Sequence, residues 1–274
     1  MPELPEVEVL RRSLEPHLVG DRIVRVEVRN PALREPVETA RLRRNTAGRD
    51  VLALRRRSKY LLIDLTGERT VVVHLGMSGR LTLAGPEEPL EPHEHVAFHL
   101  QSGRRLRFRD PRRFGLVLAL KTAEIEADPH FVHLGVEPLE GGFSGETLAR
   151  AAAGKRGPVK AFLMDARVVV GVGNIYASET LYRAGVHPAR SVARISAARW
   201  DRIAASTVAV LSQAITQGGT TLSDFADGEG RSGYFQVSLA AYDREGQPCL
   251  ACGSAVRRIV QAGRSTYYCP RCQR

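Results

Sequence analysis

The chain has 274 residues, of which 26% are charged, and 40 lysines and arginines against 30 acidic residues give it a formal net charge of +10. A surplus of this size favours a polyanionic partner, nucleic acid before membrane. No apolar run approaches the ~20 residues of a membrane-spanning helix, and the acidic start lacks the apolar segment of a secretory signal, so we expect a cytoplasmic protein.

The chain opens with Met-Pro-Glu-Leu-Pro-Glu-Val-Glu. Removal of Met1 would leave Pro2 with a free secondary amine, which titrates near pH ~8 and is therefore partly an uncharged nucleophile at neutral pH. Glu3 beside it is a candidate proton donor. Pro5 and Glu6 suit the first turn of a helix. By composition alone, an ordinary capped helix start explains the same residues.

The first half of the chain then reads as one helix followed by strands. An apolar stripe marks the helix, which Gly20 ends: Val7, Leu10, Leu14 and Leu18. The segment 23–29 alternates, and we expect Val24, Val26 and Val28 to face the core. Further β-rich runs lie at 51–54, 60–65, 70–75, 80–83, 95–100, 106–109 and 116–120. Eight strands in roughly 120 residues predict a β-sandwich behind the N-terminal helix.

Two connections between these strands hold candidate functional residues. The basic run 55–59 lies between two strands, and we interpret Arg55, Arg56 and Arg57 as a solvated face. The segment 110–115, Asp-Pro-Arg-Arg-Phe-Gly, has the composition of a hairpin tip. Phe114 there either folds back into the core or is an apolar wedge that enters a base stack when a nucleotide is extruded.

A linker is expected at about 122–142, and helical spacing begins after it. Asn174 follows a Gly-Val-Gly run and should cap a helix that ends near Gly185, and a helix N-terminus binds phosphate readily. The glycines are not a dinucleotide fingerprint, because the third glycine and a βαβ unit are missing. A later helix has one apolar face and ends at Gly218-Gly219: Trp200, Ile203, Thr207, Leu211 and Ile215. We interpret 218–236 as a mobile loop.

All four cysteines lie near the C-terminus, as two C-x₂-C pairs separated by 16 residues: Cys249, Cys252, Cys269 and Cys272. This spacing predicts a closed tetrahedral S₄ site for one structural Zn²⁺, and two disulfides are the alternative that a cytosolic chain disfavours. The segment 246–274 has five arginines and no acidic residue, so a DNA-contacting zinc ribbon is expected. Arg264 lies between the pairs, where a solvated tip residue is the simpler interpretation.

Taken together, the opening octapeptide, the His-Leu-Gly-Met of 74–77, the 110–115 segment, the Gly-Val-Gly-Asn-Ile-Tyr of 171–176 and the cysteine pairs resemble the formamidopyrimidine-DNA glycosylases. The resemblance covers most of the chain. It implies a multi-domain α+β fold: an N-terminal helix with a β-sandwich in 1–130, a helix–two-turn–helix DNA-binding domain in 143–235 with a lesion-capping loop at 218–236, and a zinc-ribbon finger in 240–274.

The resemblance also implies a base-excision repair activity. The family removes oxidised purines (8-oxoguanine and formamidopyrimidines) from duplex DNA through a Schiff base on the N-terminal proline, then cleaves the strand by β,δ-elimination. The catalytic residues would be Pro2, Glu3, Lys59 and Arg264. The DNA-binding residues would be His93, Arg112, Lys155, Met77, Phe114, Asn174 and Tyr242, to which we add Lys160 and Glu6, although lone lysines such as Lys155 and Lys160 are more often solvated. We expect a monomer that binds damaged double-stranded DNA and no membrane.

Two positions depart from the family pattern. Asp243 replaces an expected glycine, and because Asp tolerates a left-handed turn we expect no functional loss. Ser223 replaces a basic residue of some members, which leaves the lesion preference open. The alternatives are an endonuclease VIII-type glycosylase for oxidised pyrimidines and, in a different class, a non-catalytic zinc-ribbon DNA-binding protein. The latter would need no processed Pro2.

Overall fold

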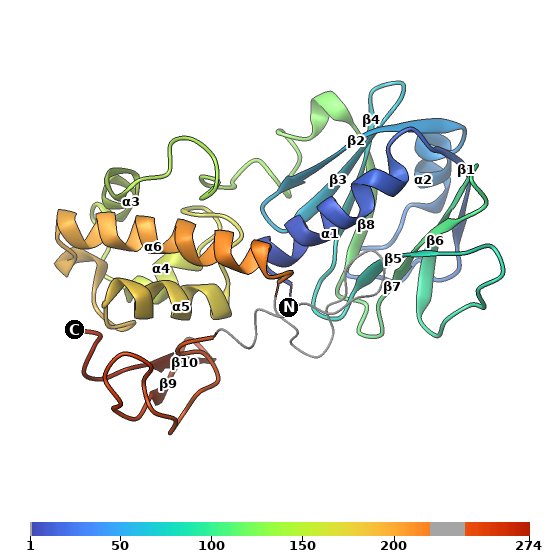
Figure 1. Cartoon of the computed structure of the whole chain (residues 1–274). Coiled ribbons are helices and arrows are strands. Elements are labelled where there is room, and N and C mark those ends of the chain that lie inside the picture. Colours follow the sequence, from blue (N-terminus) through green and yellow to red (C-terminus); the bar gives the residue numbers. More distant parts are fainter. Residues whose placement is uncertain (1, 220–238) are drawn as a thin grey trace. The chain divides into compact units, whose positions relative to one another are not determined.

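The structure is a computed structural model that describes residues 2–219 and 239–274. These residues form two compact units (Figure 1). The N-terminal unit comprises 2–132 with 217–219, and the C-terminal unit comprises 133–216 and 239–274. Most of the expected loop 218–236, including Ser223, falls outside the described residues. Within the described ranges, no helix is both long and apolar enough to cross a membrane.

Eight antiparallel strands form the body of the N-terminal unit, as predicted. They are β1 (Arg22–Val28), β2 (Arg49–Arg57), β3 (Tyr60–Leu65), β4 (Arg69–His74), β5 (Arg80–Ala84), β6 (Glu94–Leu100), β7 (Arg105–Arg109) and β8 (Leu116–Lys121). Their spatial order is β5-β7-β6-β1-β2-β3-β4-β8. β1 and β2 share only two residue pairs, Arg22 with Asp50 and Ile23 with Arg49. The strands therefore divide into two four-stranded halves, β5-β7-β6-β1 and β2-β3-β4-β8.

Helix α1 (Leu4–Leu18) covers the core of this unit. Its predicted apolar stripe is confirmed, because Val7, Leu10, Leu14 and Leu18 are each at most 1% exposed. The helix contacts β2 and β3 of one half and β5 of the other, so it is packed against both halves. The sequence did not reveal α2 (Thr39–Thr46), in which only Leu42 and Thr46 are buried.

The predicted facing of β1 is partly wrong. The register shifts between Ile23 and Arg25, which indicates a bulge. As a result Val24 is 48% exposed, whereas Ile23 and Val26 are buried. A bulge adds one residue to a strand and reverses the facing on one side of it, which alternation in the sequence cannot reveal.

The prediction of a hairpin at 110–115 is also wrong. β7 pairs with β5 and β6, whereas β8 pairs with β4. The segment therefore crosses from one half of the sandwich to the other instead of joining neighbouring strands. Its sequence has the composition of a tight turn, but composition does not show which strands are partners.

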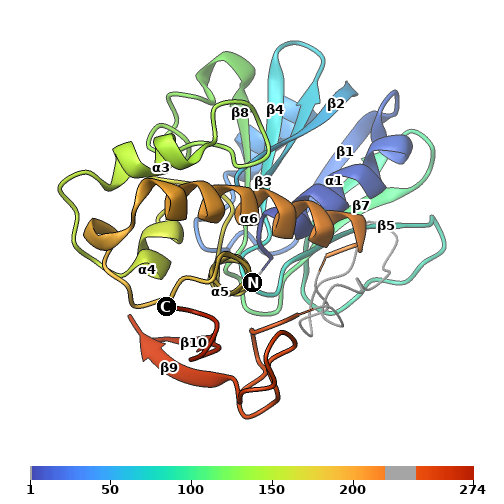
Figure 2. The ribbon, with the colours of Figure 1, turned by 60° about the vertical axis from the view of Figure 1, so that its left-hand side comes forward.

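The C-terminal unit is helical with an appended hairpin. It contains α3 (Gly145–Ala152), α4 (Val159–Leu163), α5 (Asn174–Ala184), α6 (Ala197–Thr216), β9 (Arg257–Gln261) and β10 (Arg264–Tyr268), and short 3₁₀ turns occur at Thr122–Glu124 in the N-terminal unit and Val192–Arg194 here. The predicted face of α6 is confirmed, since Trp200, Ile203 and Leu211 are at most 3% exposed. α6 packs against α3 and α5 (Figure 2).

Helix α5 begins one residue later than predicted. Gly173 is the N-cap residue and Asn174 is the first helical residue, which leaves the Asn174 side chain available for other partners. The helix ends as predicted at Gly185, whose φ of +68° is the left-handed conformation favoured at helix ends. Asp243, at the unusual position, also adopts a left-handed φ of +60°.

Candidate active site and nucleic-acid interface

The chain start is held in a rigid, buried turn. Pro2 is buried, and Glu3, the N-cap residue of α1, is 2% exposed. Glu6, which is 1% exposed, completes a capping box by accepting the backbone N–H of Glu3 at 2.8 Å. Pro5 occupies the first turn, where the missing N–H leaves no intrahelical bond unmade. The backbone nitrogen of Pro2 is therefore fixed one residue before a capped helix. Glu6, expected among the DNA-binding residues, serves this cap.

Arg56 links α1 to the turn that bears Lys59. Its side chain is 6% exposed and lies 3.4 Å from Glu8, so the expectation of a solvated arginine is wrong here. Its Nη1 also donates to the carbonyl of Ser58 at 3.1 Å. Burial by itself raises the pKa of Glu8, but hydrogen bonds from Arg11 and Arg12 outweigh it and lower the pKa. Glu8 is therefore a charged anchor for Arg56.

Lys59 occupies a two-residue turn between β2 and β3. The last paired residues are Arg57 and Tyr60, so Ser58 and Lys59 alone form the loop. Ser58 has a left-handed φ of +56°, as the tight hairpin turns of antiparallel strands require. Because Arg56 holds the carbonyl of Ser58, the turn and the start of α1 are part of one connected structure. The sequence indicated that the basic run joins two strands, but not that Arg55, Arg56 and Arg57 belong to β2 or that Arg56 has a buried partner.

Two further connections of the N-terminal unit meet at their backbones. Gly76 follows β4 with φ +65°, and a Cβ placed on it would lie 2.4 Å from the carbonyl carbon of Phe114. Met77 and Phe114 are 39% and 44% exposed, so the interpretation of Phe114 as a core residue is excluded. The guanidinium carbon of Arg112 lies 5.0 Å from the centre of the Phe114 ring. We call Met77, Arg112 and Phe114 the wedge set.

The buried carboxylate of Asp110 fixes the backbone that carries the wedge set. Asp110 is 0% exposed, and it accepts hydrogen bonds from Ser78 Oγ at 2.6 Å and from the backbone N–H of Gly115 at 2.7 Å. The backbone N–H of Arg112 donates to Ser78 Oγ at 3.2 Å. Sequence reasoning assigned no task to Asp110 or Ser78. An aspartate that begins a Pro- and Gly-containing connection was the available signal.

His74 fixes the other side of the wedge set. Its Nδ1 accepts the backbone N–H of Gly76 at 2.9 Å. Burial, with smaller effects from the positive charges of Arg34 and Lys59, lowers the pKa of His74 to about 3. His74 is therefore neutral near pH 7, and because Nδ1 accepts, the hydrogen-bond pattern assigns its proton to Nε2.

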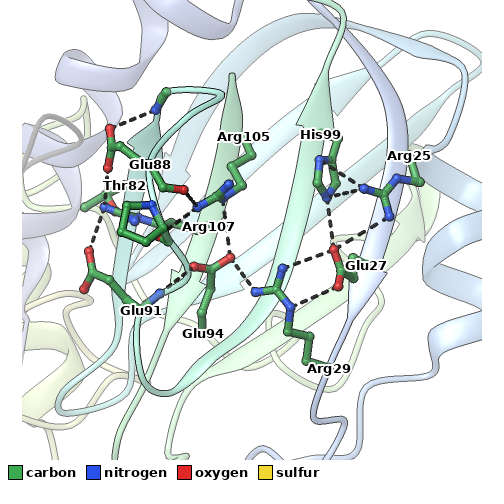
Figure 3. A network of polar contacts seen from close by, with 12 residues as sticks. Arg25, Glu27, Arg29, Thr82, Glu88, Glu91, Glu94, His99, Arg105 and Arg107 are labelled. Carbon is green, nitrogen blue, oxygen red and sulfur yellow. Dashed lines mark hydrogen bonds and ion pairs between the residues drawn. The ribbon is translucent and has the colours of Figure 1, made fainter. Parts of the chain in front are cut away.

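His93 lies near the end of the long connection between β5 and β6, which β7 holds in place. Figure 3 shows Arg105 and Arg107 of β7 beside Glu88 and Glu91 of this connection. Three alternate arginines of β7 share one face and bind this connection. Arg105 donates to the carbonyl of Glu88 at 2.7 Å, Arg107 pairs with Glu91 at 2.7 Å, and Arg109 donates to the carbonyl of Pro92 at 2.8 Å. The network continues to β6 and β1, where the buried Glu94 pairs with Arg29 at 2.7 Å.

This network sets the position of His93 beside the wedge set. His93 is exposed and has a left-handed φ of +66°. Its carbonyl accepts the backbone N–H of Asp110 at 3.0 Å. The arginines of β7 are therefore largely occupied by acidic residues and carbonyls of the same unit. We expect them to orient the connection rather than to contact an external anion.

In the C-terminal unit, Lys160 is buried, contrary to the expectation of a solvated lysine. Its ammonium donates to Asn174 Oδ1 at 2.5 Å, to Thr266 Oγ1 at 2.8 Å and to the carbonyl of Ser265 at 3.3 Å. Lys155, by contrast, is exposed, with its ammonium 5.2 Å from the centre of the Phe162 ring. Only Lys155 of the two is available on the surface.

Arg264 is the first residue of β10, directly after a two-residue turn. The turn residues Ala262 and Gly263 have φ of +48° and +72°, and Arg264 pairs with Gln261. Arg264 is exposed, as the sequence suggested.

Tyr242 is held by the buried Glu179, which accepts the backbone N–H groups of residues 240, 241 and 242 at 2.9, 2.9 and 2.7 Å. Burial raises the pKa of Glu179, and these hydrogen bonds oppose the rise. The Tyr242 ring packs edge-on against Tyr267, at 5.1 Å between ring centres. The adjacent Asp243 accepts a hydrogen bond from the Tyr267 hydroxyl at 3.2 Å. The aspartate that stands here in place of the expected glycine therefore has a hydrogen-bond partner within the same unit.

The four cysteines converge into one cluster. Their sulfur atoms all lie within 4.8 Å of one another, and the Cys249–Cys272 and Cys252–Cys269 pairs are 3.8 and 3.5 Å apart. Zn–S bonds of about 2.3 Å in a tetrahedron separate sulfurs by roughly 3.8 Å, so the cluster fits one Zn²⁺. All four are free thiols, which excludes the disulfide alternative. Four protein ligands leave no open position, so the metal is structural.

Three family models match successive segments that together cover most of the chain. The N-terminal domain model of formamidopyrimidine-DNA glycosylase matches residues 1–117, the H2TH domain model of the same enzymes matches 134–226, and a zinc finger found in FPG and IleRS matches 246–274. Two curated relatives named formamidopyrimidine-DNA glycosylase, from Methylococcus capsulatus and Halorhodospira halophila, are 50% and 51% identical over 100% of both chains.

Solved structures agree with these relatives. The MutM (FPG) protein from Thermus thermophilus is 41% identical, with a TM-score of 0.88 over 99% of this chain and 98% of that one. Wild-type Lactococcus lactis Fpg (MutM), in a complex with N7-benzyl-Fapy-dG-containing DNA, is 30% identical, with a TM-score of 0.91 over 100% of both chains.

Proposed function

The chain belongs to the formamidopyrimidine-DNA glycosylase family, and from that premise we propose how its own residues carry out the reaction. It is a base-excision repair enzyme, a DNA glycosylase and AP lyase that acts on oxidised purines and holds one structural zinc. This assignment sets aside a non-catalytic zinc-ribbon protein.

Pro2 is the proposed nucleophile, and its fixed position before a capped helix supports this role. With Met1 removed, the Pro2 nitrogen attacks C1′ of the damaged nucleotide, and the glycosidic bond breaks. The base departs with the electron pair and takes up a proton, for which the buried Glu3 is the proposed donor. Loss of the N–H proton of Pro2 then restores the lone pair on its nitrogen. This lone pair forms the C1′=N⁺ bond of an iminium as the C1′–O4′ bond of the sugar breaks, and O4′ leaves with the electron pair and takes up a proton. The iminium draws electrons from the sugar and favours elimination.

The iminium makes two strand cleavages possible. In the first, a proton leaves C2′ and the C3′–O bond breaks; in the second, a proton leaves C4′ and the C5′–O bond breaks. Each phosphate departs with the electron pair, so a cation beside it lowers the barrier. We assign Lys59 to the first elimination and Arg264 to the second. The exposed position of Arg264 and the rigid turn beneath Lys59 support these assignments.

We propose that damaged duplex DNA is bound by exposed and half-buried residues of both units. The wedge set would fill the space left by the extruded nucleotide, and the further DNA contacts would be His93, Lys155, Asn174 and Tyr242. Glu6 and Lys160 are buried, so we now assign them to positioning. We also propose that the protein is a cytoplasmic monomer. We propose domains at 1–130, 143–235 and 240–274, because the three matched domain models occupy successive parts of the chain.

The observation that carries this proposal is the pairing of a fixed Pro2 with a buried Glu3 at the capped chain start. Borohydride reduction during turnover of an 8-oxoguanine duplex should link protein to DNA, and peptide mapping should place the link on Pro2. A protein that retains Met1 should form no link, since its proline nitrogen is an amide. Trapping at Lys59, or equal trapping with Met1 retained, would overturn the assignment of Pro2.

A further inference from the structure

Lys160 joins three elements of the C-terminal unit through its ammonium group. It belongs to α4, its partner Asn174 begins α5, and its partners Ser265 and Thr266 belong to β10. Asn174 closes the network, because its Nδ2 donates to the same Ser265 carbonyl at 3.1 Å. Lys160 is 2% exposed and Thr266 is 0% exposed. A buried ammonium is tolerated only where acceptors replace its water, so these contacts fix the ammonium in place.

The same network reaches Arg264 directly. The Thr266 hydroxyl accepts from Lys160 at 2.8 Å and donates to the carbonyl of Arg264 at 3.4 Å. Arg264 and Thr266 are two residues apart in β10, so their side chains share one face of the hairpin. The turn before Arg264 has two left-handed residues, which gives the strand a defined starting point. A shift of β10 along α5 would therefore move the guanidinium of Arg264.

We propose that Lys160 is a positioning residue that holds Arg264 in register with the N-terminus of α5, and thereby sets the rate of the second elimination. This inference rests on the role that the proposed function gives to Arg264. Lys160 itself touches neither the leaving phosphate nor the DNA backbone. It transmits position through Asn174 and Thr266, and the first elimination, assigned to Lys59, does not depend on it.

The test compares two single-turnover rates on a duplex with one abasic site, at saturating protein and with zinc content verified. Lys160→Met should slow the second elimination roughly tenfold or more, the loss expected when a hydrogen-bonded charge is removed. The first elimination should stay within about twofold. Arg264→Ala should show the same selective loss, and the double variant should lose little more, because the two residues act as one unit.

Salt dependence separates positioning from DNA contact. A lysine that binds phosphate contributes about one unit to the slope of log K against log salt. Lys160→Met should leave this slope unchanged, whereas the exposed Lys155→Ala, the matched control, should reduce it by about one. A reduced slope in Lys160→Met would show that Lys160 contacts DNA and would overturn the proposal.

The remaining outcomes are also decisive. If Arg264→Ala loses the second elimination and Lys160→Met retains it, the positioning role is wrong. If Arg264→Ala retains it, the role assigned to Arg264 fails first and the inference fails with it, so the two failures are distinguishable. Should Lys160→Met lose zinc or unfold, Thr266→Val removes one acceptor at nearly constant volume. That variant should slow the second elimination by a smaller factor, and an unchanged ratio of the two rates would overturn the proposal.

Discussion

Replacement of Arg112 tests whether this protein reads the base opposite the lesion. Its backbone N–H is fixed by Ser78 at 3.2 Å, and its guanidinium lies 5.0 Å from the centre of the Phe114 ring, so both side chains project from one supported connection. Arginine offers only donors, cytosine offers the adjacent acceptors N3 and O2, and adenine offers the single acceptor N1. A correct bidentate pair is worth roughly 1–3 kcal/mol, so 8-oxoguanine opposite cytosine should be excised about 5- to 150-fold faster than opposite adenine.

The assay is single-turnover excision from the two duplexes. Arg112→Ala should bring the ratio of the two rates towards one, whereas Phe114→Ala should slow both reactions and change the ratio less. Arg113→Ala is the matched control, because Arg113 is an exposed neighbour of the same charge. Its left-handed φ of +56° strains an arginine and an alanine at position 113 equally, so the substitution changes only the side chain. Equal cleavage opposite both bases by the unmodified enzyme, or equal erosion of the ratio by Arg113→Ala, would refute the reasoning.

Three further predictions concern the zinc site, the pH dependence of stability and the backbone contact at Gly76. Chelation of the zinc should abolish duplex binding while the strand signal in circular dichroism persists, and full DNA binding by metal-free protein would contradict a structural zinc. Because the pKa of His74 is lowered to about 3 from its usual 6.5, the unfolded state binds one more proton between these values, and stability should fall as pH drops through that window. The free energy of unfolding should be about 2 kcal/mol lower at pH 5 than at pH 7.5. His74→Asn keeps an acceptor for Gly76 and should abolish this difference, as measured from urea unfolding at the two pH values. A variant that loses the same stability at pH 5 would count against a neutral His74. Gly76→Ala should destabilise the protein and erode opposite-base discrimination, since its Cβ would lie 2.4 Å from the Phe114 backbone. Gly103→Ala is the control, because Gly103 has a φ of +85° but open space around it, so the change should cost only backbone strain of roughly 1–2 kcal/mol. Equal effects of the two changes would contradict the close contact at Gly76.

Local pattern in the sequence was sufficient for the eight strands of the N-terminal unit, for α1, α5 and α6, and for the metal site, but not for α2. Runs of β-forming residues bounded by turn residues marked all eight strands of the N-terminal unit, and the stripes on α1 and α6 marked their buried faces. The cysteine spacing predicted the four-sulfur cluster because both pairs sit on tight turns whose geometry depends on near neighbours. The left-handed conformation of Asp243 agrees with the glycine that the family resemblance led us to expect there, together with the tolerance of Asp for such a turn.

Only the tertiary structure decided which polar residues are buried and which apolar residues are not. Arg56 and Lys160 read as solvated charges, yet their partners Glu8 and Thr266 lie 48 and 106 residues away in the chain. Phe114 is exposed because the connection before β8 crosses between the halves of the sandwich and rests on Gly76. A charge is buried only where distant acceptors replace its water, and an aromatic ring stays exposed only where the surrounding backbone leaves it no pocket. Both conditions depend on contacts between distant parts of the chain, which composition and periodicity do not encode.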